Sequence, residues 1–183
     1  MSASDIEFLR SQLRQYPDFP QKGILFEDIL PLFKSPKAFK LLVHSLAKHI
    51  KETHGQVDVI VGLDARGFLF GPTLALELDA AFVPVRKLGK LPGQCVTAEY
   101  IKEYGKDIFA MQEDAISQDQ RVIIVDDIIA TGGSAGAAGK LVKMVGGKTM
   151  EYVFLLELDF LKGRDQLDAP VFTLLKSQET KQL

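Results

Sequence analysis

The chain has 183 residues, a length that fits one domain with a complete hydrophobic core. Hydrophobic residues make up 46% of it and charged residues 25%, as in an ordinary globular protein, and the formal net charge of −2 argues against binding nucleic acid through general basicity. Cys95 is the only cysteine, which excludes an intrachain disulfide and fits a reducing compartment. No apolar run is long enough to cross a bilayer, and no secretory signal pattern follows Met1, so we expect a cytoplasmic protein that does not bind membranes.

The whole chain is expected to form a single domain, with residues 1–34 as an arm and hood beside a core at 35–183. A capping-box pattern at residues 4–7 predicts a helix that ends before Pro17. Turn-forming residues follow, and residues 24–28 then predict a short extended segment that ends in two acids.

After residue 35, apolar strand patterns alternate with helical ones. Residues 88–105 are polar and glycine-rich and have no clear pattern, and residues 107–116 indicate a strand and a helical turn. Strands separated by helices predict an α/β fold with a mostly parallel core sheet of about five strands flanked by helices. The expected elements, in chain order, are a helix from Pro36 to Gly55, a strand at 57–63, a helix at 68–78, a strand at 80–85, a buried strand at 122–125, a helix that ends near Val145, and strands at 152–158 and 171–175.

Three histidines, His44, His49 and His54, follow one another at five-residue intervals on the first core helix. Metal-binding histidines on a helix usually sit about four residues apart, on one face. We therefore expect these side chains to lie on a solvated face of the helix rather than to bind a metal.

The most informative segment is residues 122–134, Val-Ile-Ile-Val-Asp-Asp-Ile-Ile-Ala-Thr-Gly-Gly-Ser. The small residues allow backbone N–H groups at a helix start to crowd a bound anion, and Thr131 and Ser134 add hydroxyl donors. Because carboxylates would repel a phosphate, Asp126 and Asp127 should face a donor of hydrogen bonds such as a sugar diol. The segment therefore predicts a ribose 5-phosphate site, and its glycine spacing fits neither the Rossmann fingerprint nor the Walker A loop.

The two acids and the small-residue run resemble the phosphoribosyl pyrophosphate (PRPP) loop of type I phosphoribosyltransferases. The resemblance narrows to the adenine phosphoribosyltransferase family through further segments that run in order from about Tyr16 to Leu175, at 17–20, 23–29, 67–72, 86–93 and 103–105. The resemblance implies that the ribose and its 5′-phosphate are bound by Asp126, Asp127, Ala130, Thr131, Gly132, Gly133 and Ser134.

Ligands in such sheets bind at the carboxyl ends of the strands, so residues 64–67 and 86–87 should meet the 126–134 segment. The cations expected there to hold pyrophosphate are Arg66, Arg86, Lys87 and Lys90. The resemblance favours Asp64, Ala65 and Arg66 as the pyrophosphate loop, although relatives commonly have serine where Ala65 stands. Mg²⁺ is expected to be held mainly through PRPP oxygens, without a dedicated protein metal site.

Adenine presents a donor at N6 beside an acceptor at N1, which the carbonyl of Leu25 and the amide of Glu27 would match. A 6-oxopurine would leave both backbone groups unpaired, at a cost of about 1–3 kcal/mol each. Phe26 would stack on the base, and the resemblance implies Leu158 as the other wall. Many relatives carry arginine at position 27, and the alternative role for residues 24–26 is a small satellite core.

The expected reaction transfers the phosphoribosyl group of PRPP to adenine, giving AMP and pyrophosphate through an oxocarbenium-like transition state. Glu103 is the expected proton-transfer group, with Asp126 as the second candidate. The resemblance places Glu103 and Tyr104 on a flexible loop, at about 88–105, that closes over the substrates, and it implies a homodimer. The alternatives are a 6-oxopurine phosphoribosyltransferase, a PRPP-binding regulator without turnover, and a flavodoxin-like receiver domain.

Overall fold

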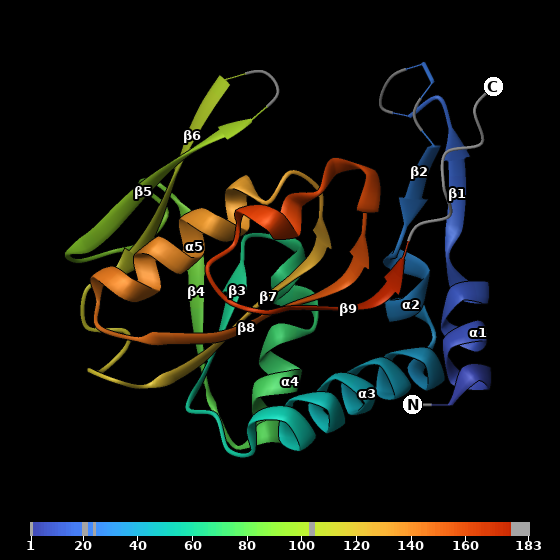
Figure 1. Cartoon of the computed structure of the whole chain (residues 1–183), viewed down its shortest axis with the longest axis horizontal. Helices are drawn as coiled ribbons and strands as arrows, with labels where there is room; N and C mark the ends of the chain where they lie inside the picture. Colours follow the sequence, from blue (N-terminus) through green and yellow to red (C-terminus); the bar gives the residue numbers. More distant parts are fainter. Residues whose placement is uncertain (1, 20–21, 24, 103–104, 177–183) are drawn as a thin grey trace.

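The computed structural model describes residues 2–19, 22–23, 25–102 and 105–176. Its centre is a 7-stranded sheet with the order β5-β6-β4-β3-β7-β8-β9 (Figure 1). The strands β4, β3, β7, β8 and β9 pair in parallel, which confirms the expected parallel core of about five strands. Their bounds are β3 Val59–Leu63, β4 Ala81–Lys87, β7 Arg121–Ile129, β8 Lys148–Glu157 and β9 Val171–Lys176.

Helices cover both faces of this sheet. The helices α3 (Pro36–His54) and α4 (Gly71–Leu78) pack on one face, and α5 (Gly133–Met144) packs on the other. Successive residues of a strand point to opposite faces, so Ile60 of β3 belongs to the first core and Val61 to the second. Short 3-10 helices lie beyond two of the strands: η1 (Arg66–Leu69) after β3, then η2 (Asp159–Leu161) and η3 (Gly163–Gln166) after β8.

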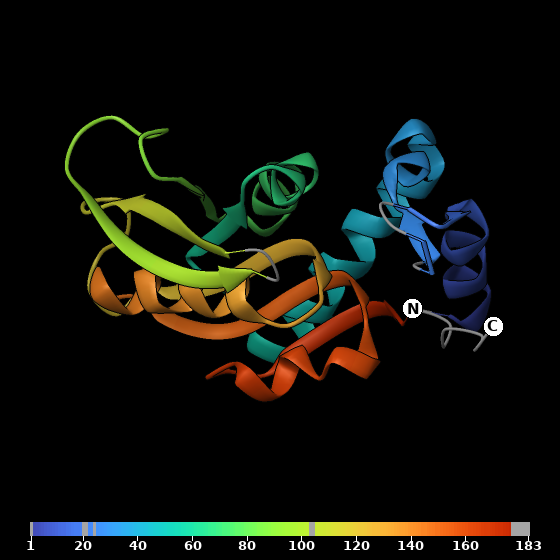
Figure 2. The same ribbon diagram turned by 90° about the horizontal axis from the view of Figure 1, so that it is seen from above.

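The hood at one end of the molecule consists of α1 (Ala3–Gln12), β1 (Arg14–Pro17), β2 (Leu25–Asp28) and α2 (Leu30–Lys34) (Figure 2). The expected capping box at residues 4–7 is wrong by two positions. Ser2 caps α1, with its hydroxyl accepting from the Asp5 amide and Asp5 accepting from the Ser2 amide. Residues 2–5 and residues 4–7 both satisfy the capping-box pattern, and the helix begins at the earlier of the two. The hydroxyl of Ser4 instead forms a hydrogen bond of 2.8 Å with the hydroxyl of Ser2. Neither β1 nor α2 was expected.

A hairpin at the other end of the molecule includes part of residues 88–105, the segment in which the sequence shows no clear pattern. It consists of β5 (Cys95–Lys102) and β6 (Gly105–Gln112), paired antiparallel and joined to the end of β4 (Figures 1 and 2). Ala98 and Tyr100 alternate toward the core, each 8% exposed, and Tyr100 packs on Phe109 with 4.5 Å between ring centroids. This two-residue period is short and lies among polar residues, so the sequence pattern is weak.

The strand β7 is longer than its apolar run. It continues through Asp126 and Asp127 to Ile129, whereas the sequence analysis ended it at Val125. The neighbouring β8 pairs with it as far as Ile129 and Glu157, so the ladder hydrogen bonds extend the strand past the acids.

The histidines of α3 also depart from expectation, because His49 and His54 do not lie on a solvated face. Their Nε2 atoms lie 2.9 and 3.2 Å from the same oxygen of Glu151, a residue of β8 that is 5% exposed. Only His44 lies at the surface, where it contacts Glu77. No helix in the described ranges is both long and apolar enough to span a membrane.

Candidate active site

The small-residue loop lies where β7 leaves the sheet, between the hood and the hairpin (Figure 1). Gly132 has a φ of 82°, in the left-handed region that glycine adopts without strain, and the chain then enters α5 at Gly133. Among the described residues, no acceptor takes the amide hydrogens of Thr131, Gly132 or Gly133. These donors lie at the positive end of the helix dipole, so the turn has the geometry of an anion-binding site.

Asp126 and Asp127 are neighbouring carboxyl groups in a poorly solvated position. Asp127 is 2% exposed, and its amide donates to Asp126 Oδ1 at 2.9 Å. Burial raises the pKa of Asp126 well above its ordinary value, and the charge of Asp127 raises it further. Burial also raises the pKa of Asp127, which the Arg66 guanidinium partly offsets. The pair resists carrying two negative charges, so hydrogen-bond donors or a cation beside it would stabilise the ionised forms.

The loop after β3 reaches the same acids. Residues 64–65, joined by a cis peptide bond, lead from β3 into η1. Arg66 Nε then lies 3.1 Å from Asp127 Oδ2. A Cβ on Gly67 would lie 2.8 Å from the Val125 carbonyl oxygen, so only glycine allows the loop to approach β7 this closely. The parallel sheet therefore brings together two segments far apart in the sequence, as the rule for strand ends predicts.

The basic residues at the end of β4 contact acids on both sides. Arg86 Nε donates to Asp64 Oδ2 at 2.8 Å, and its Nη1 donates to the Lys90 carbonyl at 3.2 Å. Lys87 Nζ lies 3.2 Å from Asp107 Oδ2 on β6. Arg86 thus joins the 64–67 loop, Lys87 is directed to the hairpin, and the Lys90 side chain is exposed.

A cavity of about 470 Å³ lies between the hood and η1. Phe19 and Phe26 meet there edge to face, with ring centroids 5.0 Å apart. The cavity offers a largely aromatic and aliphatic surface to a flat ligand, with Arg66 at its border. Its lining residues are Tyr16, Phe19, Phe26, Asp28, Ile29, Leu30 and Arg66.

The strand β2 presents alternate side chains to this cavity. Phe26 lines it, whereas Glu27 points the other way, where Oε1 accepts from Gln15 Nε2 at 2.9 Å. Glu27 Oε2 is buried with no hydrogen-bond partner in the described part of the chain. Leu158, the expected second wall, is not one of the cavity's lining residues; it follows β8, and its amide donates to the Ile129 carbonyl at 3.0 Å.

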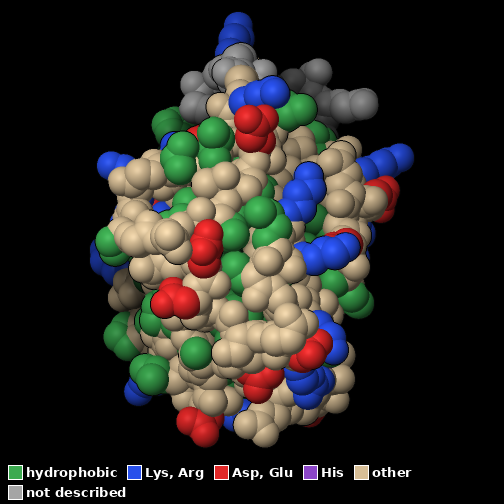
Figure 3. All heavy atoms as spheres, turned by 90° about the vertical axis from the view of Figure 1, so that its left-hand side faces the viewer, with side chains coloured by type: hydrophobic (Ala, Val, Ile, Leu, Met, Phe, Trp, Pro, Cys, Tyr) green, Lys and Arg blue, Asp and Glu red, His purple; other side chains and the backbone are tan. Residues whose placement is uncertain are grey.

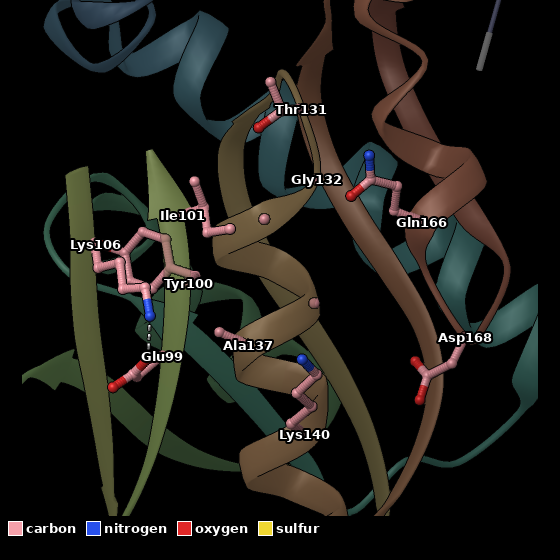
Figure 4. Close-up of a pocket in the computed structure, with 12 residues that line it drawn as sticks. Glu99, Tyr100, Ile101, Lys106, Thr131, Gly132, Ala137, Lys140, Gln166 and Asp168 are labelled. Carbon is pink, nitrogen blue, oxygen red and sulfur yellow. Dashed lines mark hydrogen bonds and ion pairs between the residues drawn. The ribbon is translucent and has the colours of Figure 1, made fainter. Parts of the chain in front are cut away.

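A second cavity, of about 700 Å³, lies between the hairpin and α5, with the anion-binding turn at one end (Figure 4). The hairpin reaches this turn, because a Cβ on Gly133 would lie 3.1 Å from the Ile101 carbonyl oxygen. Tyr100 donates to Asp107 Oδ2 at 3.3 Å, and burial raises the pKa of Tyr100 to about 12. The expected site residues Glu103 and Tyr104, which follow β5 in the sequence, lie outside the described residues.

Acidic and basic side chains are interspersed over the described part of the face that carries the hairpin (Figure 3). They do not gather there into one basic surface of the kind that tracks a nucleic-acid backbone.

A family model for the phosphoribosyl transferase domain matches residues 32–182. The adenine phosphoribosyltransferase of Yarrowia lipolytica is 65% identical over 173 residues, which cover 93% of this chain and 95% of the relative. Adenine phosphoribosyltransferase 1 of Saccharomyces cerevisiae is 58% identical over 179 residues, covering 97% and 96%. The chain belongs to the adenine phosphoribosyltransferase family.

Solved structures of adenine phosphoribosyltransferases share the whole fold. The Saccharomyces cerevisiae enzyme, complexed with an imino-altritol bisphosphate and adenine, has a TM-score of 0.93 at 57% identity, over 95% of this chain and 100% of that chain. The Trypanosoma brucei enzyme, in complex with AMP, pyrophosphate and ribose-5-phosphate, has a TM-score of 0.87 at 27% identity, over 94% and 79%. The α/β fold and the family resemblance of the sequence motifs are thereby confirmed.

The sequence analysis did not assign five of the residues that line the hood cavity: Tyr16, Phe19, Asp28, Ile29 and Leu30. The available signal was the short segment before Pro17, which pairs with β2 in the register Tyr16 to Phe26. Proline at the end of a strand is compatible with an edge position, so the segment was readable as one side of a hairpin.

Proposed function

We propose that this protein transfers the 5-phosphoribosyl group of PRPP to adenine, giving AMP and pyrophosphate in purine salvage. The observation that carries the proposal is the position of Arg66. It borders the aromatic cavity and also lies 3.1 Å from Asp127 beside the anion-binding turn. A base in the cavity and a ribose on the aspartate pair would therefore be neighbours, as bond formation between them requires.

The residues around the turn would orient PRPP. The amides of Thr131, Gly132 and Gly133 would receive the 5′-phosphate, and the hydroxyls of Thr131 and Ser134, with Ala130 beside them, would complete the cradle. The ribose diol would donate to Asp126 and Asp127, whose negative charge lies on the side where the ribose gains positive character.

The pyrophosphate would lie against residues 64–66. Arg66 and Arg86 offer planar forks for phosphate oxygens, and both stand at this loop through their contacts with Asp127 and Asp64. Lys87 and Lys90 would add charge from the β4 side, with the flexibility that lysine side chains have.

Mg²⁺ is the proposed metal. The described residues contain no group of three or more acids, histidines or cysteines suited to a metal, and the aspartate pair supplies only carboxylate oxygens. That donor set fits a hard cation held chiefly by substrate oxygens. When bound, Mg²⁺ would neutralise charge on the leaving pyrophosphate.

Base selection would rest on backbone groups of β2. Pro17 is the register partner of Leu25 and has no N–H, so it gives the Leu25 carbonyl no hydrogen bond. That carbonyl and the Glu27 amide would read N6 and N1 of adenine while Phe26 stacks on the ring. Leu158 would form the second wall by closing over the base from the end of β8.

The proton released at the purine would pass to Glu103, with Asp126 as the alternative acceptor. Ile101, two residues before Glu103 in the sequence, lies against the turn at Gly133, which supports β5 as an element that approaches the ribose. Glu103→Gln should lower turnover without changing PRPP affinity; normal rates in single-turnover assays would contradict this assignment.

The function is tested by supplying adenine, hypoxanthine or guanine with PRPP, with Mg²⁺ or with a chelator. Of the three bases, we expect only adenine to react, giving AMP and pyrophosphate, and we expect this reaction only when Mg²⁺ is present. Turnover of hypoxanthine or guanine would indicate a 6-oxopurine enzyme, and PRPP binding without turnover would indicate a regulator. We further propose a cytoplasmic homodimer, which light scattering of the purified protein and microscopy of the tagged protein would test.

A further inference from the structure

The segment between β8 and β9, at residues 158–167, forms a strap that contains η2 and η3 (Figure 1). It passes directly behind the anion-binding turn, although the two are about 30 residues apart in sequence. Apart from Leu158, no strap residue has a part in the proposed reaction. Its contacts with the turn nevertheless involve the backbone itself.

Gly163 is the point of contact, and it is buried. A Cβ at this position would lie 2.8 Å from the Gly132 nitrogen and 2.9 Å from the Thr131 carbonyl carbon, and closer still to the Ala130 carbonyl oxygen. The reverse holds too, because a Cβ on Gly132 would collide with the Gly163 carbonyl. The two backbones therefore touch with no space for a side chain between them.

Glycine is needed at 163 for this contact and not for its own conformation. Its φ lies outside the left-handed region, unlike that of Gly132. An alanine at 163 would thus be tolerated by the strap itself and would act by displacing the turn.

An ion pair next to Gly163 fixes the strap. Arg164 donates from Nε to Glu157 Oε1 at 2.6 Å and from Nη2 to Oε2 at 2.5 Å, and Thr173 also donates to Oε2 at 3.1 Å. Glu157 is 4% exposed and pairs in register with Ile129, the last residue of β7. The Arg164 guanidinium holds the pKa of Glu157 below its ordinary value, so the pair stays charged.

We propose that Glu157, Gly163 and Arg164 are positioning residues that set the amides of the turn for the 5′-phosphate of PRPP and AMP. The inference rests on the proposed function. The turn is made of small residues, and its amides have no acceptor among the described residues, so the turn does little to fix its own shape. The strap supplies a rigid surface behind it, and bidentate pairing holds that surface in register with the end of β7.

The test compares binding of AMP and adenosine, which differ only in the 5′-phosphate, by calorimetry. The dissociation constant of adenosine divided by that of AMP reports the contribution of the 5′-phosphate alone. Gly163→Ala should reduce that ratio by about tenfold or more, the loss expected for displaced charge-assisted hydrogen bonds, while adenosine affinity stays the same. Gly136→Ala is the matched control, because a Cβ there would make only an ordinary 3.7 Å contact with Leu167.

Arg164 gives a second test should Gly163→Ala fail to fold, because its side chain is 40% exposed. Arg164→Met should reduce the ratio, and Arg164→Lys should restore part of it. An unchanged ratio in the foldable variants, or equal weakening of AMP and adenosine, would overturn the inference. Failure of the proposed function would look different: wild-type protein would then not distinguish AMP from adenosine, or would produce no AMP.

Discussion

Arg66 Nε lies 3.1 Å from Asp127 Oδ2, and the two side chains differ greatly in exposure, at 47% and 3%. A partly solvated guanidinium thus supports a carboxylate that burial alone would disfavour in its charged form. Binding of PRPP would replace this one contact by two, with Arg66 turning to the pyrophosphate and Asp127 accepting from the ribose diol. The ion pair therefore holds both groups at the site and favours the charged form of Asp127.

Arg66→Gln should weaken PRPP binding, because the pyrophosphate loses a charged donor. A hydrogen bond to a charged group contributes about 1.5–3 kcal/mol, so kcat/KM for PRPP should fall roughly 10–150-fold. Arg66→Lys should recover part of the loss, since lysine keeps the charge without the planar fork. Steady-state kinetics with varied PRPP measure both, and unchanged kcat/KM in Arg66→Gln would contradict the assignment.

PRPP affinity should fall as the pH is lowered through the raised pKa values of Asp126 and Asp127. The diol requires carboxylates as acceptors, and these carboxyls take up protons at a higher pH than ordinary aspartates do. Pyrophosphate has no diol and serves as the control for titration of the phosphate groups. Calorimetry across the acidic range should show a steeper loss for PRPP than for pyrophosphate; parallel curves would count against the diol role.

Asp126→Asn should stabilise the ligand-free protein at neutral pH while impairing catalysis. The pKa of Asp126 is raised on folding, so the folded state holds this proton more tightly, and stability is lost as the pH rises through the folded-state pKa. Each unit by which folding raises this pKa lowers the free energy of unfolding at neutral pH by about 1.4 kcal/mol. The neutral amide of asparagine would not lose this stability. Thermal unfolding of both proteins at neutral and acidic pH tests this, and we expect the difference to shrink in acid.

Phe26→Ala should raise KM for adenine and leave PRPP binding almost unchanged. Stacking of a base on an aromatic side chain contributes about 1–3 kcal/mol, so the rise should be roughly 5–150-fold. Phe33→Ala removes a hood phenylalanine that packs on Phe39, with centroids 5.3 Å apart, and so controls for general loosening of the hood. Equal effects of the two variants on adenine KM would argue that Phe26 only fills the satellite core.

Glu27→Gln should leave adenine KM and base preference unchanged, because this side chain points away from the cavity toward Gln15. The substitution keeps an oxygen that can accept from Gln15 and replaces a buried oxygen that has no partner in the described chain, so no existing hydrogen bond is lost and stability should not fall. Initial rates with adenine and hypoxanthine, together with a melting curve, measure both. A changed base preference would mean that the side chain at position 27 reads the purine.

The sequence by itself determined the parts of the site that are contiguous in the chain. Residues 126–134 carry the acids, the small residues and the helix start together, and their chemistry follows from backbone donors and carboxylates within a few residues. The alternation of strands and helices determined the parallel sheet, and that geometry alone brings residues 64–67 and 86–87 to the same edge.

Only the tertiary structure decided which distant backbones meet. The continuation of β7 past Asp127 depends on pairing with β8, and β5 is a strand because Tyr100 and Ala98 find a core to pack into. The contact of Gly163 with Gly132 leaves no periodic or local signal, since glycine at 163 is required by a neighbour some 30 residues away. Local patterns report interactions within a turn or two of chain, whereas partners brought together by folding are specified by the packing of the whole domain.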